Sequence, residues 1–158
     1  MADSKAPDAK ASFNQLETLL EDYLGKKAPA MPDNIKETLV SFAPYLAIIG
    51  VVLAVPGILA LLGAGAMVGP FSAFLGAGYM MHYGASYFIG MAGLVVTAVL
   101  EALAISGLFK RSMGAWRLMY YSVLVSLVTS VFQGSLFGGL IGTLIGLYIL
   151  FQVKAKYK

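Results

Sequence analysis

The stretch Tyr45-Leu-Ala-Ile-Ile-Gly-Val-Val-Leu-Ala-Val-Pro-Gly-Ile-Leu-Ala-Leu-Leu-Gly-Ala-Gly-Ala-Met-Val68 decides the fold class of this chain. It holds no charged residue, and no charge occurs anywhere between Glu37 and Glu101. A helix of about 24 residues is roughly 36 Å long, which is enough to cross a hydrocarbon core of about 30 Å with some tilt. The sequence therefore predicts an integral membrane protein.

The overall composition agrees with this prediction. Of the 158 residues, 59% are hydrophobic and only 12% are charged, whereas soluble domains are about half apolar and about a quarter charged. Such a composition excludes a soluble enzyme, a nucleic-acid-binding protein and a disordered regulator. Because the chain has no cysteine, disulfides, thiolate catalysis and cysteine-based metal sites are excluded as well.

Three further apolar runs follow, at residues 84–109, 114–132 and 136–153. With the run at 45–68 they predict an all-α fold, a membrane four-helix bundle within a transmembrane domain at 39–158. We expect Pro44 to bend or break the helix that enters the bilayer, and Pro56-Gly57 to kink the first span. Residues 69–83 are apolar but rich in glycine, so a loop in the interface, a re-entrant segment and an additional crossing all stay open.

The positions of the basic residues argue against an additional crossing at residues 69–83. With four spans, nine lysines and arginines lie on one side of the membrane, and the two opposite loops contain none. Basic residues favour the cytoplasmic side, so we expect both termini in the cytoplasm, beneath the plasma or inner membrane if the source is prokaryotic. The nine residues are Lys26, Lys27, Lys36, Lys110, Arg111, Arg117, Lys154, Lys156 and Lys158.

Residues 1–38 predict a cytoplasmic tail, a short amphipathic helix and a proline-containing linker. Ser12 is the expected N-cap and Gly25 the expected stop. The apolar residues recur at helical spacing, with three acids opposite them: Phe13, Leu16, Leu20 and either Tyr23 or Leu24 against Glu17, Glu21 and Asp22. Two interpretations remain open. The helix rests on the membrane surface or on the protein's own loops, or it docks on another subunit.

The fourth span carries a ladder of glycines every four residues, at Gly134, Gly138, Gly142 and Gly146. A second row of small residues, Ser135, Gly139 and Thr143, runs beside it. Small residues let two helix backbones approach closely in a membrane. This glycine-zipper pattern predicts either tight packing inside the protein or a face for self-association or a partner helix.

Glu101 is the only acid inside the apolar spans. A carboxylate there costs several kcal/mol unless it is paired, protonated or hydrated. One interpretation is a structural ion pair with Arg117, which begins the adjacent helix, or with Lys110. The other is a functional role, as a proton relay or as a binding group for a cation.

His82 is the only histidine. Its position favours a hydrogen bond in the membrane interface, although a single imidazole could also ligate a haem or a pigment. We likewise expect Trp116, Tyr120 and Tyr121 in the interface. No residue pattern indicates a metal site or a catalytic set, so we expect no enzyme activity and no cofactor other than bound lipid.

The closing string Gly146-Leu-Tyr-Ile-Leu-Phe-Gln-Val-Lys-Ala-Lys-Tyr-Lys158 resembles that of small uncharacterised prokaryotic multi-pass membrane proteins. The stretch from Leu24 to Gly50, with its Lys-Lys-Ala-Pro and Phe-Ala-Pro-Tyr-Leu strings, adds to this resemblance. The resemblance implies a multi-pass architecture and carries no activity and no site residue.

The sequence as a whole favours a non-enzymatic structural or accessory membrane subunit that packs with partner proteins or with copies of itself. Two alternatives follow from single residues: a small oligomeric transporter or channel that uses Glu101, and a pigment- or haem-associated subunit that uses His82. In each case we expect membrane lipid as a partner and no nucleic acid.

Overall fold

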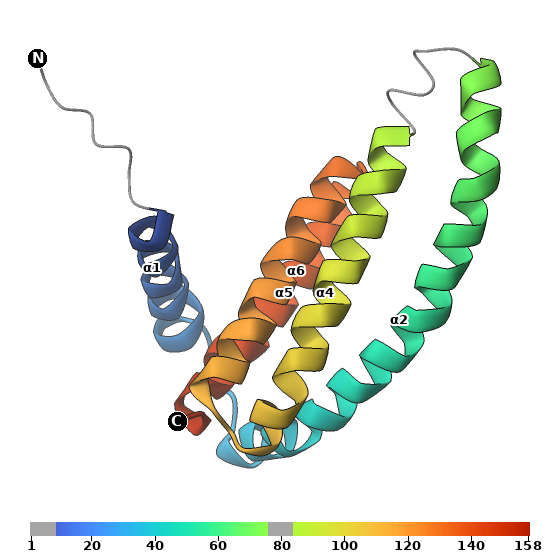
Figure 1. The fold of residues 1–158 in the computed structure, drawn as a ribbon. Helices are drawn as coiled ribbons and strands as arrows, with labels where there is room; N and C mark the ends of the chain where they lie inside the picture. Colours follow the sequence, from blue (N-terminus) through green and yellow to red (C-terminus); the bar gives the residue numbers. More distant parts are fainter. Residues whose placement is uncertain (1–8, 76–83) are drawn as a thin grey trace, which may run out of the picture.

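A computed structural model describes the backbone of residues 9–75 and 84–158, and the side chains of 11–63 and 84–158 (Figure 1). Every element in this part of the chain is helical. In chain order the elements are α1 (Ala9–Leu20), the π-helix η1 (Glu21–Lys27), α2 (Asp33–Leu75), α4 (Ala85–Phe109), α5 (Met113–Phe132), α6 (Leu136–Val153) and the short 3₁₀ helix η3 (Lys154–Lys156).

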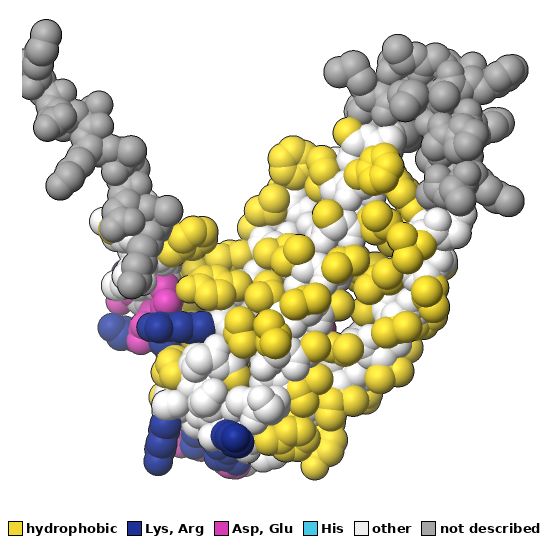
Figure 2. All heavy atoms as spheres, viewed as in Figure 1, with side chains coloured by type: hydrophobic (Ala, Val, Ile, Leu, Met, Phe, Trp, Pro, Cys, Tyr) yellow, Lys and Arg dark blue, Asp and Glu magenta, His cyan; other side chains and the backbone are white. Residues whose placement is uncertain are grey.

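Four of these helices have segments that are long and apolar enough to cross a membrane, which indicates a membrane protein. Among the described residues the segments are Asp33–Gly63, Ala85–Phe109, Met113–Phe132 and Leu136–Lys156. Hydrophobic side chains cover the visible surface of the long helices, and the lysines, arginines and acids gather toward one end (Figure 2). We call this end, where α2 begins and α6 finishes, the charged end.

The long helices pack as neighbours in a short series. Helix α4 lies between α2 and α5, and α6 packs on α5, while α2 meets α6 only at the charged end. Helix α2 leans away from α4 toward its Leu75 end (Figure 1). The bounds of α4, α5 and α6 lie within one residue of the apolar runs expected from the sequence.

Helix α2 is longer than the sequence indicates. It runs unbroken from Asp33 to Leu75 through both Pro44 and Pro56, and it curves along its length (Figure 1). The expected break at Pro44 is therefore absent, because membrane helices tolerate proline where neighbouring helices and local adjustment satisfy the freed carbonyl. Residues 69–75 continue α2. Residues 76–83, the rest of the glycine-rich segment, lie outside the described residues.

The amphipathic helix also differs from its expected bounds. It begins at Ala9, so Ser12 is not its cap, and it passes Gly25 as a π-helix that ends at Lys27. The backbone N–H of Ala28 donates to the carbonyl of Tyr23 at 2.9 Å, which closes this wider turn. Contacts from far along the chain explain the continuation, since the Gln152 amide donates to the carbonyl of Leu24 at 2.8 Å.

The turn between α4 and α5 is held by the C-terminal residues of the chain. Arg111 adopts a left-handed conformation with φ 53°, and the side chain of Ser112 accepts a hydrogen bond from the N–H of Ala115 as the N-cap of α5. Lys158 donates to the carbonyl of Arg111 at 2.8 Å and accepts from the N–H of Met113 at 2.7 Å. The turn and the C-terminus therefore support each other at the charged end.

The core near this end is aromatic. Trp116 stacks on Tyr120 with ring centroids 5.7 Å apart, and both rings meet Phe151 edge-on. The indole N–H of Trp116 donates to the carbonyl of Leu150 at 2.8 Å. Trp116 and Tyr120 are buried inside the protein, and their expected place at the depth of the membrane interface stays a prediction. Only Tyr121, which is partly exposed, keeps a surface position.

Candidate functional site

A cavity of about 350 Å³ lies between α2, α4, α5 and α6. It extends from the level of Gly50 and Gly146 down to Tyr157 at the charged end. The lining is almost wholly apolar, and it includes Leu46, Met119, Val123, Ile149 and Leu150 as well as Trp116. Glu101 is the one acidic residue in this lining.

Glu101 comes from α4 and lies at the deeper end of the cavity, opposite Gly50 of α2. A Cβ atom placed on Gly50 would lie 3.0 Å from Oε2 of Glu101, so the glycine leaves the space that the carboxylate occupies. Gly50 lies on the same face of α2 as Leu46, one helical turn away, and both line the cavity.

The structure does not bring Glu101 to the basic partners considered from the sequence. Lys110 and Arg117 are exposed, and among the described ion pairs neither of them contacts an acid. The neighbouring Arg111 pairs with Glu37 of α2 instead. Within the described residues, Glu101 has no hydrogen bond and no ion pair, so the carboxylate faces an apolar cavity without a partner.

The other ionisable group in the lining is Tyr157, which follows η3 at the charged end. Burial raises the pKa of its phenol, and the nearby Arg111 lowers it by a smaller amount. The net direction is upward, so Tyr157 stays a neutral phenol at physiological pH. Glu101 is then the one group in the lining that can carry a negative charge there.

The four glycines of the ladder in the fourth span do not share one contact surface. Gly134 forms the turn before α6 with φ 72°, and Gly146 faces Val123 of α5. Gly138 and Gly142 are exposed, and nothing lies within 4 Å of a Cβ placed on Gly142. A four-residue step overshoots a full turn by about 40°, so the ladder turns from the outer surface of α6 at Gly138 toward α5 at Gly146.

The second row of small residues makes the contact with α5. Thr143 is buried, and a Cβ on Gly139 would collide with Ser130. A similar close approach that the sequence analysis missed joins α4 to α5, where Cβ atoms on Gly90 and Gly93 would collide with Gln133 and Thr129. In the sequence, this contact could have been recognised from two glycines three residues apart, Gly90 and Gly93, and two polar residues four apart, Thr129 and Gln133.

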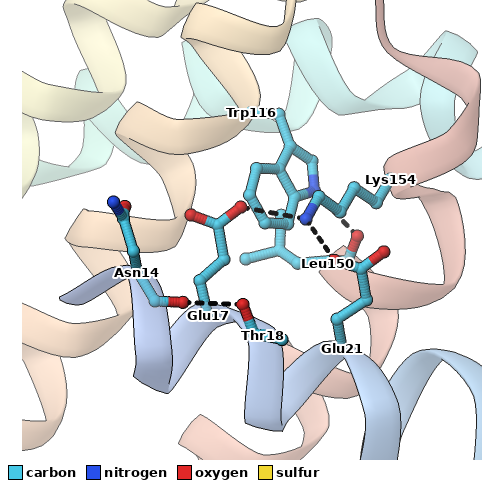
Figure 3. Close-up of polar contacts among 7 residues, drawn as sticks. All are labelled: Asn14, Glu17, Thr18, Glu21, Trp116, Leu150 and Lys154. Atoms are coloured by element: carbon cyan, nitrogen blue, oxygen red, sulfur yellow. Dashed lines mark hydrogen bonds and ion pairs between the residues drawn. The ribbon is translucent and has the colours of Figure 1, made fainter. Parts of the chain in front are cut away.

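Lys154 fastens the amphipathic helix to the end of α6. Its ammonium group lies 2.9 Å from Oε1 of Glu17 and 2.7 Å from Oε2 of Glu21 (Figure 3). The same group stands over the ring of Trp116, 4.9 Å from its centroid. Both acids, which were expected opposite the apolar residues of the helix, therefore contact the end of α6. The helix rests on its own chain, in agreement with one of the two open interpretations.

The linker after this helix is bound to α6 as well. The hydroxyl of Tyr148 donates to the carbonyl of Pro29 at 2.7 Å, and the N–H of Met31 donates to the side-chain oxygen of Gln152 at 3.0 Å. Glu17 and Glu21 face α6, and the helix exposes apolar side chains to its surroundings. These are Phe13, Leu16, Leu19 and Tyr23.

His82 lies outside the described residues, so the structure does not test it as a ligand of a haem or pigment. Among the residues that were described, no group of three histidines, cysteines or acids could hold a metal ion.

Comparison of the chain with known protein families, with curated proteins and with solved structures gave no match.

Proposed function

We propose that this protein is a non-enzymatic structural or accessory membrane subunit that assembles through the outer surface of α6. The observation that carries the proposal is the pair Gly138 and Gly142, which are both exposed within the part of the chain that the structure describes. We call the surface formed by Phe137, Gly138, Ile141, Gly142 and Ile145 the α6 face. Its three large members are well exposed, and Phe137 is 85% exposed.

Membrane chemistry explains why such a surface favours association. Lipid chains are as apolar as leucine, so exposed large hydrophobic residues by themselves give no drive to pair. Exposed glycines do favour pairing, because they let the backbone of a second helix approach closely. The two helices then gain van der Waals contact along a whole turn. On the α6 face, Ile141 and the other large residues flank the glycines and would close around an incoming helix.

A second copy of this chain is the partner that fits best. A close crossing requires small residues on both helices, and a second α6 face supplies Gly138 and Gly142 again. Two-fold symmetric pairing uses the same surface on both subunits. The amphipathic helix is a weaker candidate for docking, because Glu17 and Glu21 are already bound to Lys154 of the same chain.

The substitution Gly142→Leu tests this proposal. It places a large side chain in the middle of the α6 face, where a Cβ on Gly142 meets no atom of the described residues within 4 Å, so the fold is expected to persist. Overpacking of a close contact costs about 1–3 kcal/mol, which corresponds to a dimer weakened about fivefold or more. Native mass spectrometry of the purified protein in mild detergent measures the dimer fraction.

The matched control is Gly63→Leu on α2, where a Cβ also meets nothing within 4 Å. We expect this variant to keep the wild-type dimer fraction. A protein that is monomeric at every concentration, or a Gly142→Leu variant that dimerises like wild type, would contradict the proposal. Ion or solute flux in liposomes that disappears in Glu101→Gln would favour the alternative of transport.

A further inference from the structure

The cavity beside Glu101 is apolar, yet its deep end holds a carboxylate that no described residue pairs. An ionised acid in such surroundings is costly unless a cation, a proton or water compensates it. Replacement by a neutral residue would remove this cost, and the chain instead keeps a glycine at position 50 that makes room for the carboxylate. The arrangement therefore combines a carboxyl group, an apolar wall and free volume.

We infer that this cavity is a binding site for a small lipophilic amine in its protonated form. The ammonium group lies against the carboxylate of Glu101 at the level of Gly50. The apolar body of the ligand extends toward the charged end, along Leu46, Met119 and Leu150, which line the cavity below. The site is separate from the α6 face, so it does not depend on assembly.

The carboxylate of Glu101 and the small number of oxygen ligands in the lining favour an organic cation over a metal ion, an anion or a neutral molecule. Metal ions such as Ca²⁺ and Mg²⁺ require several oxygen ligands, and the lining offers one carboxylate and the phenol of Tyr157. An anion would be repelled by Glu101. A neutral apolar molecule would fill the space but leave the carboxylate unpaired, whereas an ammonium group donates charge-assisted hydrogen bonds to it.

The volume limits the size of the ligand. Small-molecule pockets generally span roughly 300–1,000 Å³, and this cavity, at about 350 Å³, is near the lower limit. A compact, cage-shaped amine is therefore a better fit than a long amphiphile or a large aromatic dye. The probe 1-aminoadamantane meets this requirement, and 1-adamantanol has nearly the same shape without the charge.

The chain supplies its own reporter for the test. Trp116 is the only tryptophan and it lines the cavity, so intrinsic fluorescence of the full-length protein reports on this one location. In detergent at neutral pH, we expect 1-aminoadamantane to change the Trp116 emission in a saturable manner. A hydrogen bond to a charged group is worth about 1.5–3 kcal/mol, so the amine should bind about tenfold or more tightly than 1-adamantanol.

Two variants connect the signal to the site. Glu101→Gln keeps the size of the side chain and removes its charge, so the preference for the amine over the alcohol should disappear. Gly50→Val fills the deep end with the acid still present, and binding of both probes should weaken about tenfold or more as the space is lost. Gly63→Val, on the exposed surface of α2, is the control and should bind like wild type.

The inference is overturned by equal affinity for the amine and the alcohol, by a response that does not saturate, or by amine binding that persists in Glu101→Gln. If Glu101→Gln does not fold, Gly50→Val decides the matter, because unchanged amine binding in that variant places the ligand elsewhere.

Discussion

Tyr120 shows how tightly side chains pack at the scale of the residue. Its ring is 1% exposed and lies between Trp116 and Phe151, but its hydroxyl finds no hydrogen-bond partner among the described residues. Burial of a polar group without a partner costs free energy. The ring therefore stabilises the core, whereas the hydroxyl opposes it.

The substitution Tyr120→Phe removes only the hydroxyl. We expect the free energy of unfolding to stay the same or to rise by up to about 1 kcal/mol, since the unpartnered group no longer has to be desolvated. Thermal unfolding of the protein in detergent, followed by circular dichroism, measures the change. A loss of more than about 1 kcal/mol would mean that the hydroxyl has a partner.

Trp116→Phe is the useful comparison for that experiment. It also alters one buried ring, but it removes the hydrogen bond to the carbonyl of Leu150 and part of the stacking on Tyr120. We expect it to destabilise the protein by about 1–3 kcal/mol. If Tyr120→Phe is neutral or stabilising and Trp116→Phe is destabilising, the unpartnered hydroxyl and the hydrogen-bonded indole contribute to stability with opposite sign.

At the scale of the element, the amphipathic helix is the part whose placement depends most on distant contacts. Lys154 pairs with Glu17 and Glu21, and Gln152 binds the carbonyl of Leu24 and the N–H of Met31. An edge-to-face contact between Phe13 and Tyr121 extends the interface along α5. These contacts explain why the helix continues past Gly25 and why its acids face inward.

Lys154→Met should release this helix from the rest of the protein. The variant leaves two acids beside an aromatic core without their cation, and the loss of charge-assisted hydrogen bonds costs about 1–3 kcal/mol. We expect amide hydrogen exchange to accelerate over residues 9–27 and to change little in α4 and α5. Mass spectrometry of peptides from the exchanged protein provides this measurement.

Lys156→Met is the matched control for the release of the helix. Lys156 lies two residues further on, and its carboxylate partners, Asp33 and Glu37, belong to α2. Exchange over residues 9–27 should therefore stay at the wild-type rate. Equal acceleration in the two variants would show that a general loss of positive charge, and not the contact of Lys154 with Glu17 and Glu21, controls the helix.

At the scale of the whole molecule, the sequence predicts the bounds of α4, α5 and α6 well and the course of α2 poorly. Predominantly apolar runs and the turns at Lys110 and Gly134 locate α4, α5 and α6 to within one residue, because a helix that could cross a membrane needs about 20 mostly apolar residues. The uninterrupted course of α2 through Pro44 is not predictable from local propensity, which treats proline as a helix breaker in water.

The candidate site was predictable only in part. The isolation of Glu101 in an apolar span marks it as unusual, but its position opposite Gly50 depends on how α2 packs against α4. Likewise the glycine spacing of α6 marks a close contact without saying which glycines face inward. Gly139 packs on α5, whereas Gly138 and Gly142 face outward, and only the arrangement of neighbouring helices distinguishes them.

Disulfide cross-linking within the membrane tests the central claim, assembly through the α6 face, most directly. The chain has no cysteine, so Ile145→Cys introduces a single thiol one turn from Gly142, at a side chain that is 55% exposed. Leu59→Cys, at a side chain of α2 that is 62% exposed, is the control. We predict that mild oxidation in native membranes yields a covalent dimer of Ile145→Cys and leaves Leu59→Cys monomeric. Equal cross-linking of the two variants, or none for Ile145→Cys, would contradict the account.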